Sequence, residues 1–367
     1  MMPGVRRISE RLARSPVVRA WLASRVVVLA ALLTAWLIPG HHNASLLSWD
    51  ASWYDTIAVR GYAASPAGAV RFFPALPLLA RWSGAVLLLP PGVLLVVIAN
   101  AAALLYLHLA RRVALDAGLG EPAAALVPAV VAFAPAGFVL VMGYPEALSG
   151  VLVCVVLLGA RNGRWLPCAI AGLAAGALRP TGVLLCLPVV IEACRGLRGA
   201  GPAGLAGRAA AAVAPAAGLG LYLGWAWRAY GDPLEPFRAQ TVPGLRGGVV
   251  VNPIATLAGA AHTIVAGRPG WILLRVVWVV VALALLVVAA RRLPASFTAF
   301  AAVTLFLAVT AQSFGSFERY ACSALPLLLA AAAVLAARPR LRLAAAIGAP
   351  LVLFGQALLS FAGTYVP

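Results

Sequence analysis

The sequence predicts an all-α polytopic membrane protein, and three observations lead to this fold class. Hydrophobic residues make up 63% of the 367 residues and charged residues only 10%, and the mean hydropathy is +0.98. Soluble domains carry about 25% charged residues, so this chain belongs in lipid. A helical span needs about 20 apolar residues, which leaves room for about eleven spans in a single transmembrane domain over residues 1–367.

Charge, Pro and Gly interrupt the apolar runs and set the expected limits of the spans. The first run follows five arginines, as in a signal peptide, but no small-residue cleavage site follows it, and we expect an uncleaved span. The spans are nearly free of charge, and Arg25, Glu192 and Arg275 are expected near span ends. In order, we expect spans over about 17–38, 86–108, 123–142, 147–160, 166–178, 181–193, 210–228, 271–290, 295–313, 321–336 and 343–362.

The basic residues, all of them arginines, indicate the orientation. Although the net charge is +18, they are spread over many loops rather than one patch, so we expect no nucleic-acid partner. With a cytoplasmic N-terminus, every inner loop carries at least two, as the positive-inside rule requires. The C-terminus and two long loops, 39–85 and 229–270, are then extracytoplasmic. The inner arginines are Arg6, Arg7, Arg11, Arg14, Arg19, Arg111, Arg112, Arg161, Arg164, Arg195, Arg198, Arg208, Arg291, Arg292, Arg338, Arg340 and Arg342.

The first outer loop holds the segment with the clearest chemistry. Apolar residues recur at helical spacing from Leu46 to Ile57, which predicts an interfacial helix over 46–60 with tryptophans at the headgroup level. That helix would hold Asp50 at the boundary between lipid and water, where a carboxylate needs a partner or a task. Asp55, five residues further, points about 140° away. Pro74 and Pro77 are expected to prevent a simple helix after it.

The loop and four later segments resemble a known family. "WDASWYDTIAVRGY" (Trp49–Tyr62) with "RFFPALPLL" (Arg71–Leu79) resembles the first extracytoplasmic loop of the second GPI mannosyltransferase, the PIG-V type, and its bacterial relatives. Further matches in the same order are "YPEAL" (Tyr144–Leu148), "GLAAGALRPTGVLL" (Gly172–Leu185), "WRAYGDPLEPFRAQ" (Trp227–Gln240) and "FERYACSALPLLL" (Phe317–Leu329).

This resemblance implies a GT-C glycosyltransferase fold in a bacterial plasma membrane. Such enzymes work on the extracytoplasmic face, take a sugar from a lipid-phosphate donor, here polyprenyl-phosphate-mannose, and invert the anomeric centre. The acceptor is expected to be a lipid-linked or glycan molecule, and membrane lipids surround the enzyme. The first-loop aspartate, Asp50 here, serves as the base. No cofactor and no metal are expected.

Further site residues follow from the outer position and from the resemblance. Three arginines are candidates for the donor phosphate because the planar guanidinium suits phosphate. The alternatives are an acid partner for Arg179, an ion pair with Glu318 or Glu146 for Arg319, and lipid headgroups for Arg71. Six residues are candidates for substrate contact. Glu146 is equally expected at a helix start, and its other role is to hold sugar hydroxyls or to orient Arg179. Tyr144 is alternatively expected in the interfacial belt, and Asp232 in a turn. The phosphate candidates are Arg179, Arg319 and Arg71; the substrate candidates are Trp49, Tyr54, Tyr144, Glu146, Asp232 and Gln240.

Two other functions remain open at this point. A lipid or glycan transporter or flippase would place charges in the middle of spans and interrupt paired helices. A noncatalytic partner subunit of a mannosyltransferase would tolerate the loss of Asp50.

Overall fold

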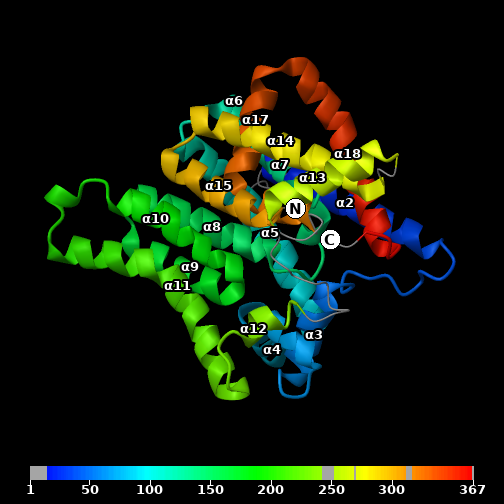
Figure 1. Cartoon of the computed structure of the whole chain (residues 1–367), viewed down its shortest axis with the longest axis horizontal. Coiled ribbons are helices and arrows are strands. Elements are labelled where there is room, and N and C mark those ends of the chain that lie inside the picture. Colours follow the sequence, from blue (N-terminus) through cyan, green and yellow to red (C-terminus); the bar gives the residue numbers. More distant parts are fainter. Residues whose placement is uncertain (1–14, 242–251, 268–269, 311–315, 366–367) are drawn as a thin grey trace, which may run out of the picture.

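The chain folds into a bundle of helices, seen in the computed structural model of Figure 1. The structure describes residues 15–241, 252–267, 270–310 and 316–365, and every regular element among them is a helix. Five helices are long and apolar enough to cross a membrane, and a sixth span would combine two helices bent by 81°. The five are α2 (Pro16–Trp36), α5 (Pro91–Asp116), α11 (Pro202–Tyr230), α14 (Gly270–Arg292) and α18 (Pro339–Phe361); the bent pair is α16 (Phe317–Ser323) and α17 (Leu325–Ala337).

The other helices are shorter than a span. Because every described element is a helix, the all-helical class is confirmed. Because only five or six of these described elements are long enough to cross a membrane, the expected eleven crossings are not confirmed. The shorter α-helices are α3 (Asp50–Arg60), α4 (Ala75–Leu87), α6 (Glu121–Ala124), α7 (Val127–Ala132), α8 (Glu146–Arg161), α9 (Trp165–Leu178), α10 (Cys186–Ala193), α12 (Glu235–Arg238), α13 (Pro253–Val265) and α15 (Ala295–Val309); the 3-10 helices are η1 (Ala67–Arg71), η2 (Gly137–Leu140), η3 (Pro180–Leu185) and η4 (Leu197–Gly199).

Proline explains why the apolar run over 123–142 is not one helix. Pro122 and Pro128 each stand in the first turn of a short helix, α6 and α7. Pro135 follows the end of α7, and the chain then forms the 3-10 helix η2. A proline lacks the backbone N–H and disfavours helical geometry in the residue before it. Hydropathy alone could not distinguish this broken run from a continuous span.

The charge on α2 lies deeper than expected. Arg25 stands near the middle of this helix, not near its end, and is buried. Its Nε donates to Asn100 Oδ1 at 3.0 Å and its Nη2 to the Leu140 carbonyl at 3.0 Å, while Asn100 Nδ2 donates to the Val141 carbonyl at 2.9 Å. These bonds satisfy carbonyls that the broken run leaves without helical partners, as an apolar environment requires.

The segment 39–85, which was expected to be an outer loop, contains α3, η1 and α4, and these gather with α12 at one end of the molecule in Figure 1. The interfacial helix begins at Asp50 rather than Leu46. The expectation that prolines exclude a helix after residue 71 is wrong: Pro74 is the N-cap of α4 and Pro77 lies in its first turn. Proline is tolerated there because the first N–H groups of a helix have no intrahelical partner.

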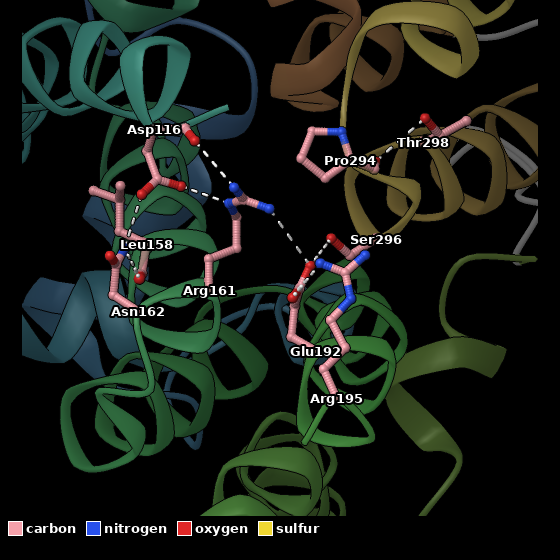
Figure 2. A network of polar contacts seen from close by, with 9 residues as sticks. All are labelled: Asp116, Leu158, Arg161, Asn162, Glu192, Arg195, Pro294, Ser296 and Thr298. Atoms are coloured by element: carbon pink, nitrogen blue, oxygen red, sulfur yellow. Dashed lines mark hydrogen bonds and ion pairs between the residues drawn. The ribbon is translucent and has the colours of Figure 1, made fainter. Parts of the chain in front are cut away.

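Helix α8 separates two polar clusters. At its last residue, Arg161 Nε lies 2.6 Å from Asp116 Oδ2, and Arg161 Nη1 lies 3.9 Å from Glu192 Oε1, which also accepts a hydrogen bond from Ser296 (Figure 2). This network joins the ends of α5, α8 and α10 to the start of α15. At the first residue of α8 stands Glu146, about 22 Å away at 1.5 Å per residue. The second cluster is built around this residue.

Candidate active site

Asp50 is the first residue of α3, and two hydrogen bonds fix the turn that presents it. The preceding residue, Trp49, has φ 61° and ψ −130°, a conformation that costs a non-glycine residue about 1–3 kcal/mol. Its indole Nε1 donates to the Ser360 carbonyl at 2.9 Å, and the Asp50 backbone N–H donates to the Tyr144 hydroxyl at 3.1 Å. A strained backbone of this kind persists only where surrounding contacts hold it in place. Here the two hydrogen bonds hold the Trp49 conformation and so fix the position of Asp50.

Four charged side chains form a continuous chain from Asp50 into the protein. Arg319 Nη1 donates to Asp50 Oδ2 at 2.7 Å, and Arg319 Nε lies 3.5 Å from Glu146 Oε1. Arg179 Nη1 lies 2.9 Å from the same Glu146 oxygen. The side chain of Asp50 is 26% exposed, whereas those of Arg319 and Glu146 are 9% and 7% exposed. Asp50 is therefore the member of this chain with the most exposed side chain among the three compared.

The four charges come from four helices distant in sequence. Glu146 is the first residue of α8, where the helix dipole favours an acid, and Arg179 follows the last residue of α9. Arg319 lies on α16, next to the buried Glu318, whose Oε2 accepts a hydrogen bond from the Tyr365 hydroxyl at 3.0 Å. The segment at the end of α18 thus holds α16 through Tyr365 and the turn before Asp50 through Ser360.

Arg71 is the third predicted phosphate arginine, and it lies apart from the buried pairs. It ends η1, is half-buried, and stands 4.8 Å from the ring centre of Phe72 and 5.2 Å from that of Trp53. Burial lowers the pKa of Arg71, while the nearby Asp50 and Tyr54 raise it. Arg71 therefore adds a positive charge close to Asp50, within the same segment 39–85.

Tyr54 and Tyr144 have little or no surface to offer a sugar. Tyr144 is fully buried and Tyr54 is 6% exposed. Tyr144 supports the Asp50 backbone, and its ring lies 5.6 Å below the Arg319 guanidinium. Burial, with Asp50 and Glu146 close by, raises the pKa of Tyr54. Both tyrosines, which were expected to contact substrate, are buried beside the charged chain, and Tyr144 also supports Asp50.

Asp55, Asp232 and Gln240 are not brought to this cluster. A methyl group added to Gly92 would lie 2.9 Å from Asp55 Oδ1, so this carboxylate faces the first turn of α5. Asp232 accepts a hydrogen bond from the Leu234 N–H at 2.9 Å and forms an ion pair with Arg238 at 2.7 Å. These contacts place Asp232 in the turn before α12, the structural alternative expected for it. Gln240 follows α12, and that short helix packs against η1, which ends at Arg71.

The protein interior beside the charged chain holds a small cavity. It measures about 30 Å³ and is lined by Glu146 and Arg319 together with Tyr106, Ser149 and Ser323. This volume suits one or two water-sized groups and is too small for a sugar. Across the described residues, no three His, Cys, Asp or Glu side chains gather as potential metal ligands.

An aromatic cluster joins the first loop to the end of α11, and the sequence reasoning missed it. Tyr222 and Trp225 stack at 5.4 Å between ring centres, and Tyr62 and Phe73 of the first loop lie 4.8 Å from Trp225 and 4.6 Å from Tyr222. The Tyr222 hydroxyl donates to the Val70 carbonyl at 2.6 Å. The dense aromatic run "LYLGWAWRAY" was the available signal. The cluster fixes η1, and with it Arg71.

Comparison with known proteins adds little to this geometry. No protein-family model and no curated protein matches the sequence. Among solved structures, the chain is similar to the crystal structure of the Archaeoglobus fulgidus oligosaccharyltransferase complex with Zn and sulfate, at 14% identity and a TM-score of 0.46, over 93% of this chain and 53% of that one. The chain thus spans about half the length of that protein. A likeness of this size establishes neither a shared fold nor a shared activity.

Proposed function

We propose that this protein is an inverting GT-C glycosyltransferase. It transfers mannose from polyprenyl-phosphate-mannose to a lipid-linked or glycan acceptor on the extracytoplasmic face of a bacterial plasma membrane. The observation that carries the proposal is the Asp50–Arg319 pair, a partly exposed carboxylate held by a buried arginine. The resemblance of five separate segments to the GPI mannosyltransferase family supports it, because four of those segments supply the charged chain.

Asp50 performs the proton transfer in this reaction. The acceptor hydroxyl oxygen attacks C1 of the mannose from the face opposite the phosphate, and its proton passes to the Asp50 carboxylate. The bond between C1 and the phosphate oxygen breaks, and polyprenyl phosphate leaves with one more negative charge than it carried in the donor. Arg319 keeps the carboxylate oriented through the 2.7 Å contact to its Oδ2.

The surrounding charges suit a leaving phosphate. Arg71, Arg179 and Arg319 contribute three positive charges, and Asp50 and Glu146 two negative ones, so the group carries a formal excess of one positive charge. Preorganised positive charge stabilises the negative charge that develops as the phosphate departs. Because Arg179 and Arg319 are buried against carboxylates, we assign the direct phosphate contact to Arg71.

A transfer assay tests the base, and the chain supplies a matched control. Purified protein is given radiolabelled polyprenyl-phosphate-mannose and a panel of lipid and glycan acceptors. Asp50→Asn should lower turnover by about 10²–10⁴-fold, the usual loss of a general base. Asp55→Asn removes the same charge from the same helix, on the side that faces α5, and should keep turnover within a few-fold of the wild type.

Each other outcome points to a different conclusion. Wild-type turnover by Asp50→Asn would remove this residue as the base. Equal losses in both variants would indicate a general effect of charge on α3. If the wild-type protein transfers mannose to no acceptor, the result would favour a noncatalytic partner subunit. Movement of a labelled lipid between the leaflets of proteoliposomes would favour a transporter.

A further inference from the structure

A hollow lined by three arginines opens far from Asp50. It measures about 260 Å³ and lies between the end of α14 and the end of α17. Arg291 and Arg292 from α14 and Arg338 after α17 line it, over a floor that includes Val288 and Val334. The proposed glycosyl transfer does not use this place.

The hollow lies at the same end of the helix bundle as the polar network around Arg161 in Figure 2. Two residues after Arg292, Pro294 leads into α15, and Ser296 there donates to Glu192 at the Arg161 end of α8. This end of α8 is opposite Glu146 and the Asp50 cluster. It is also the face that the arginine distribution predicts to be cytoplasmic.

The three arginines are exposed and face no acid in the hollow. In the described part of the chain, none of them forms an ion pair with a carboxylate. The arginines nearby in the fold, such as Arg161 and Arg195, are bound to Asp116 and Glu192. The hollow therefore keeps three positive charges available, and planar guanidinium groups bind phosphate oxygens well.

An apolar stripe on α14 leads directly to these charges. Its side chains recur at intervals of three or four residues and are 45–60% exposed, and the next position of the same stripe is Arg291. Such a stripe on a span faces lipid chains, and the arginines at its end lie where headgroups begin. The stripe consists of Leu273, Val277, Val280, Leu283 and Val287.

We infer that this hollow binds the phosphate of an anionic phospholipid whose acyl chain lies along α14. The headgroup phosphate contacts Arg291, Arg292 and Arg338, and the chain covers the stripe. Basic pockets between spanning helices on the cytoplasmic side bind anionic headgroups in this way. A free phosphate would use the charges alone, whereas a phospholipid would use both the charges and the adjoining apolar stripe, and this continuity favours a lipid.

Native mass spectrometry of the purified protein in neutral detergent tests this site. Dioleoylphosphatidylglycerol and dioleoylphosphatidylcholine are titrated separately, and the dissociation constant of the first bound lipid is measured. Two triple variants each lose three positive charges. The hollow variant is Arg291→Gln/Arg292→Gln/Arg338→Gln. The control variant changes exposed arginines of other inner loops that form no ion pair in the described structure: Arg112→Gln/Arg164→Gln/Arg198→Gln.

The hollow variant should bind the first phosphatidylglycerol at least about tenfold more weakly than the wild type, since each arginine near a membrane surface contributes severalfold. The control variant should stay close to the wild type, and phosphatidylcholine should bind weakly to all three proteins. Excess inorganic phosphate should not displace the lipid. If the triple variant folds poorly, the single variant Arg338→Gln takes its place, because it changes one exposed residue. This single variant should also bind phosphatidylglycerol more weakly than the wild type.

Three results would overturn the inference. Equal losses in the hollow and control variants would show that surface charge in general attracts the lipid. Equal affinity for the two lipids would remove the role of the anionic headgroup. Displacement by inorganic phosphate would make the hollow a site for free anions.

Discussion

Replacing Arg319 by glutamine tests the geometry of the charged chain most directly. The change leaves Asp50 Oδ2 and Glu146 Oε1 without the cation that stands 2.7 Å and 3.5 Å from them. Removing one partner of a buried ion pair costs about 3–5 kcal/mol. Because Glu146 keeps Arg179 at 2.9 Å and the Asp50 side chain is 26% exposed, we expect the lower end, about 3 kcal/mol.

A double-mutant cycle separates the pair from its surroundings. Asp50→Asn alone leaves Arg319 with Glu146, so its cost should be about 1 kcal/mol. If the two side chains interact as the structure shows, the double variant should be more stable than the sum of the singles by about 1 kcal/mol or more. Unfolding in mixed micelles, titrated with dodecyl sulfate and followed by tryptophan fluorescence, gives each free energy.

The pair Asp232–Arg238 is a control at the same distance. Its atoms also lie 2.7 Å apart, but the Arg238 side chain is 68% exposed. An exposed pair contributes at most about 1 kcal/mol, so its cycle should show a smaller coupling. The reasoning fails if the Asp50–Arg319 cycle is additive within about 0.5 kcal/mol, or if the two pairs couple equally.

Three further changes test the packing, and thermal unfolding of the purified variants measures each. Gly218→Ala should destabilise by about 1–3 kcal/mol, because its methyl group would overlap a carbonyl of α9, whereas Gly220→Ala on the same helix points into open space and should be neutral or slightly stabilising. Tyr365→Phe should cost about 2 kcal/mol by leaving the buried Glu318 without that hydrogen bond; a variant as stable as the wild type would remove this contact. Arg25→Gln should cost about 2–3 kcal/mol, since a shorter amide cannot reach all the acceptors that the guanidinium satisfies, and an unchanged melting temperature would contradict its supporting role.

The sequence predicted the local features well. Helical spacing around Trp53 predicted an interfacial helix, and α3 covers most of that range. The position of Asp50 on a different face from Asp55 follows from the same periodicity. These features depend on residues within a few turns of one another, where spacing carries the information.

The sequence could not show what long-range packing decides. Arg319 lies 269 residues after Asp50, and no local pattern pairs them, so the sequence left Arg319 between a phosphate contact and an ion pair with Glu318 or Glu146. Hydropathy measures affinity for lipid rather than continuity of a helix, which is why the run over 123–142 was expected to be a span. Pro77 was expected to prevent a helix that it in fact helps to begin, because the effect of proline depends on its distance from the helix start.

The length of α8 has a consequence for how a lipid-borne substrate is reached. Its two charged ends stand about 22 Å apart, whereas the oily layer of a bilayer is about 30 Å thick. If α8 crosses the bilayer with Arg161 at one surface, Glu146 and its neighbour Asp50 lie below the opposite surface. In the proposed glycosyl transfer, such a recessed centre would meet a sugar that lies just below the headgroups. The carrier could then give up its cargo while its long tail stays dissolved among the acyl chains.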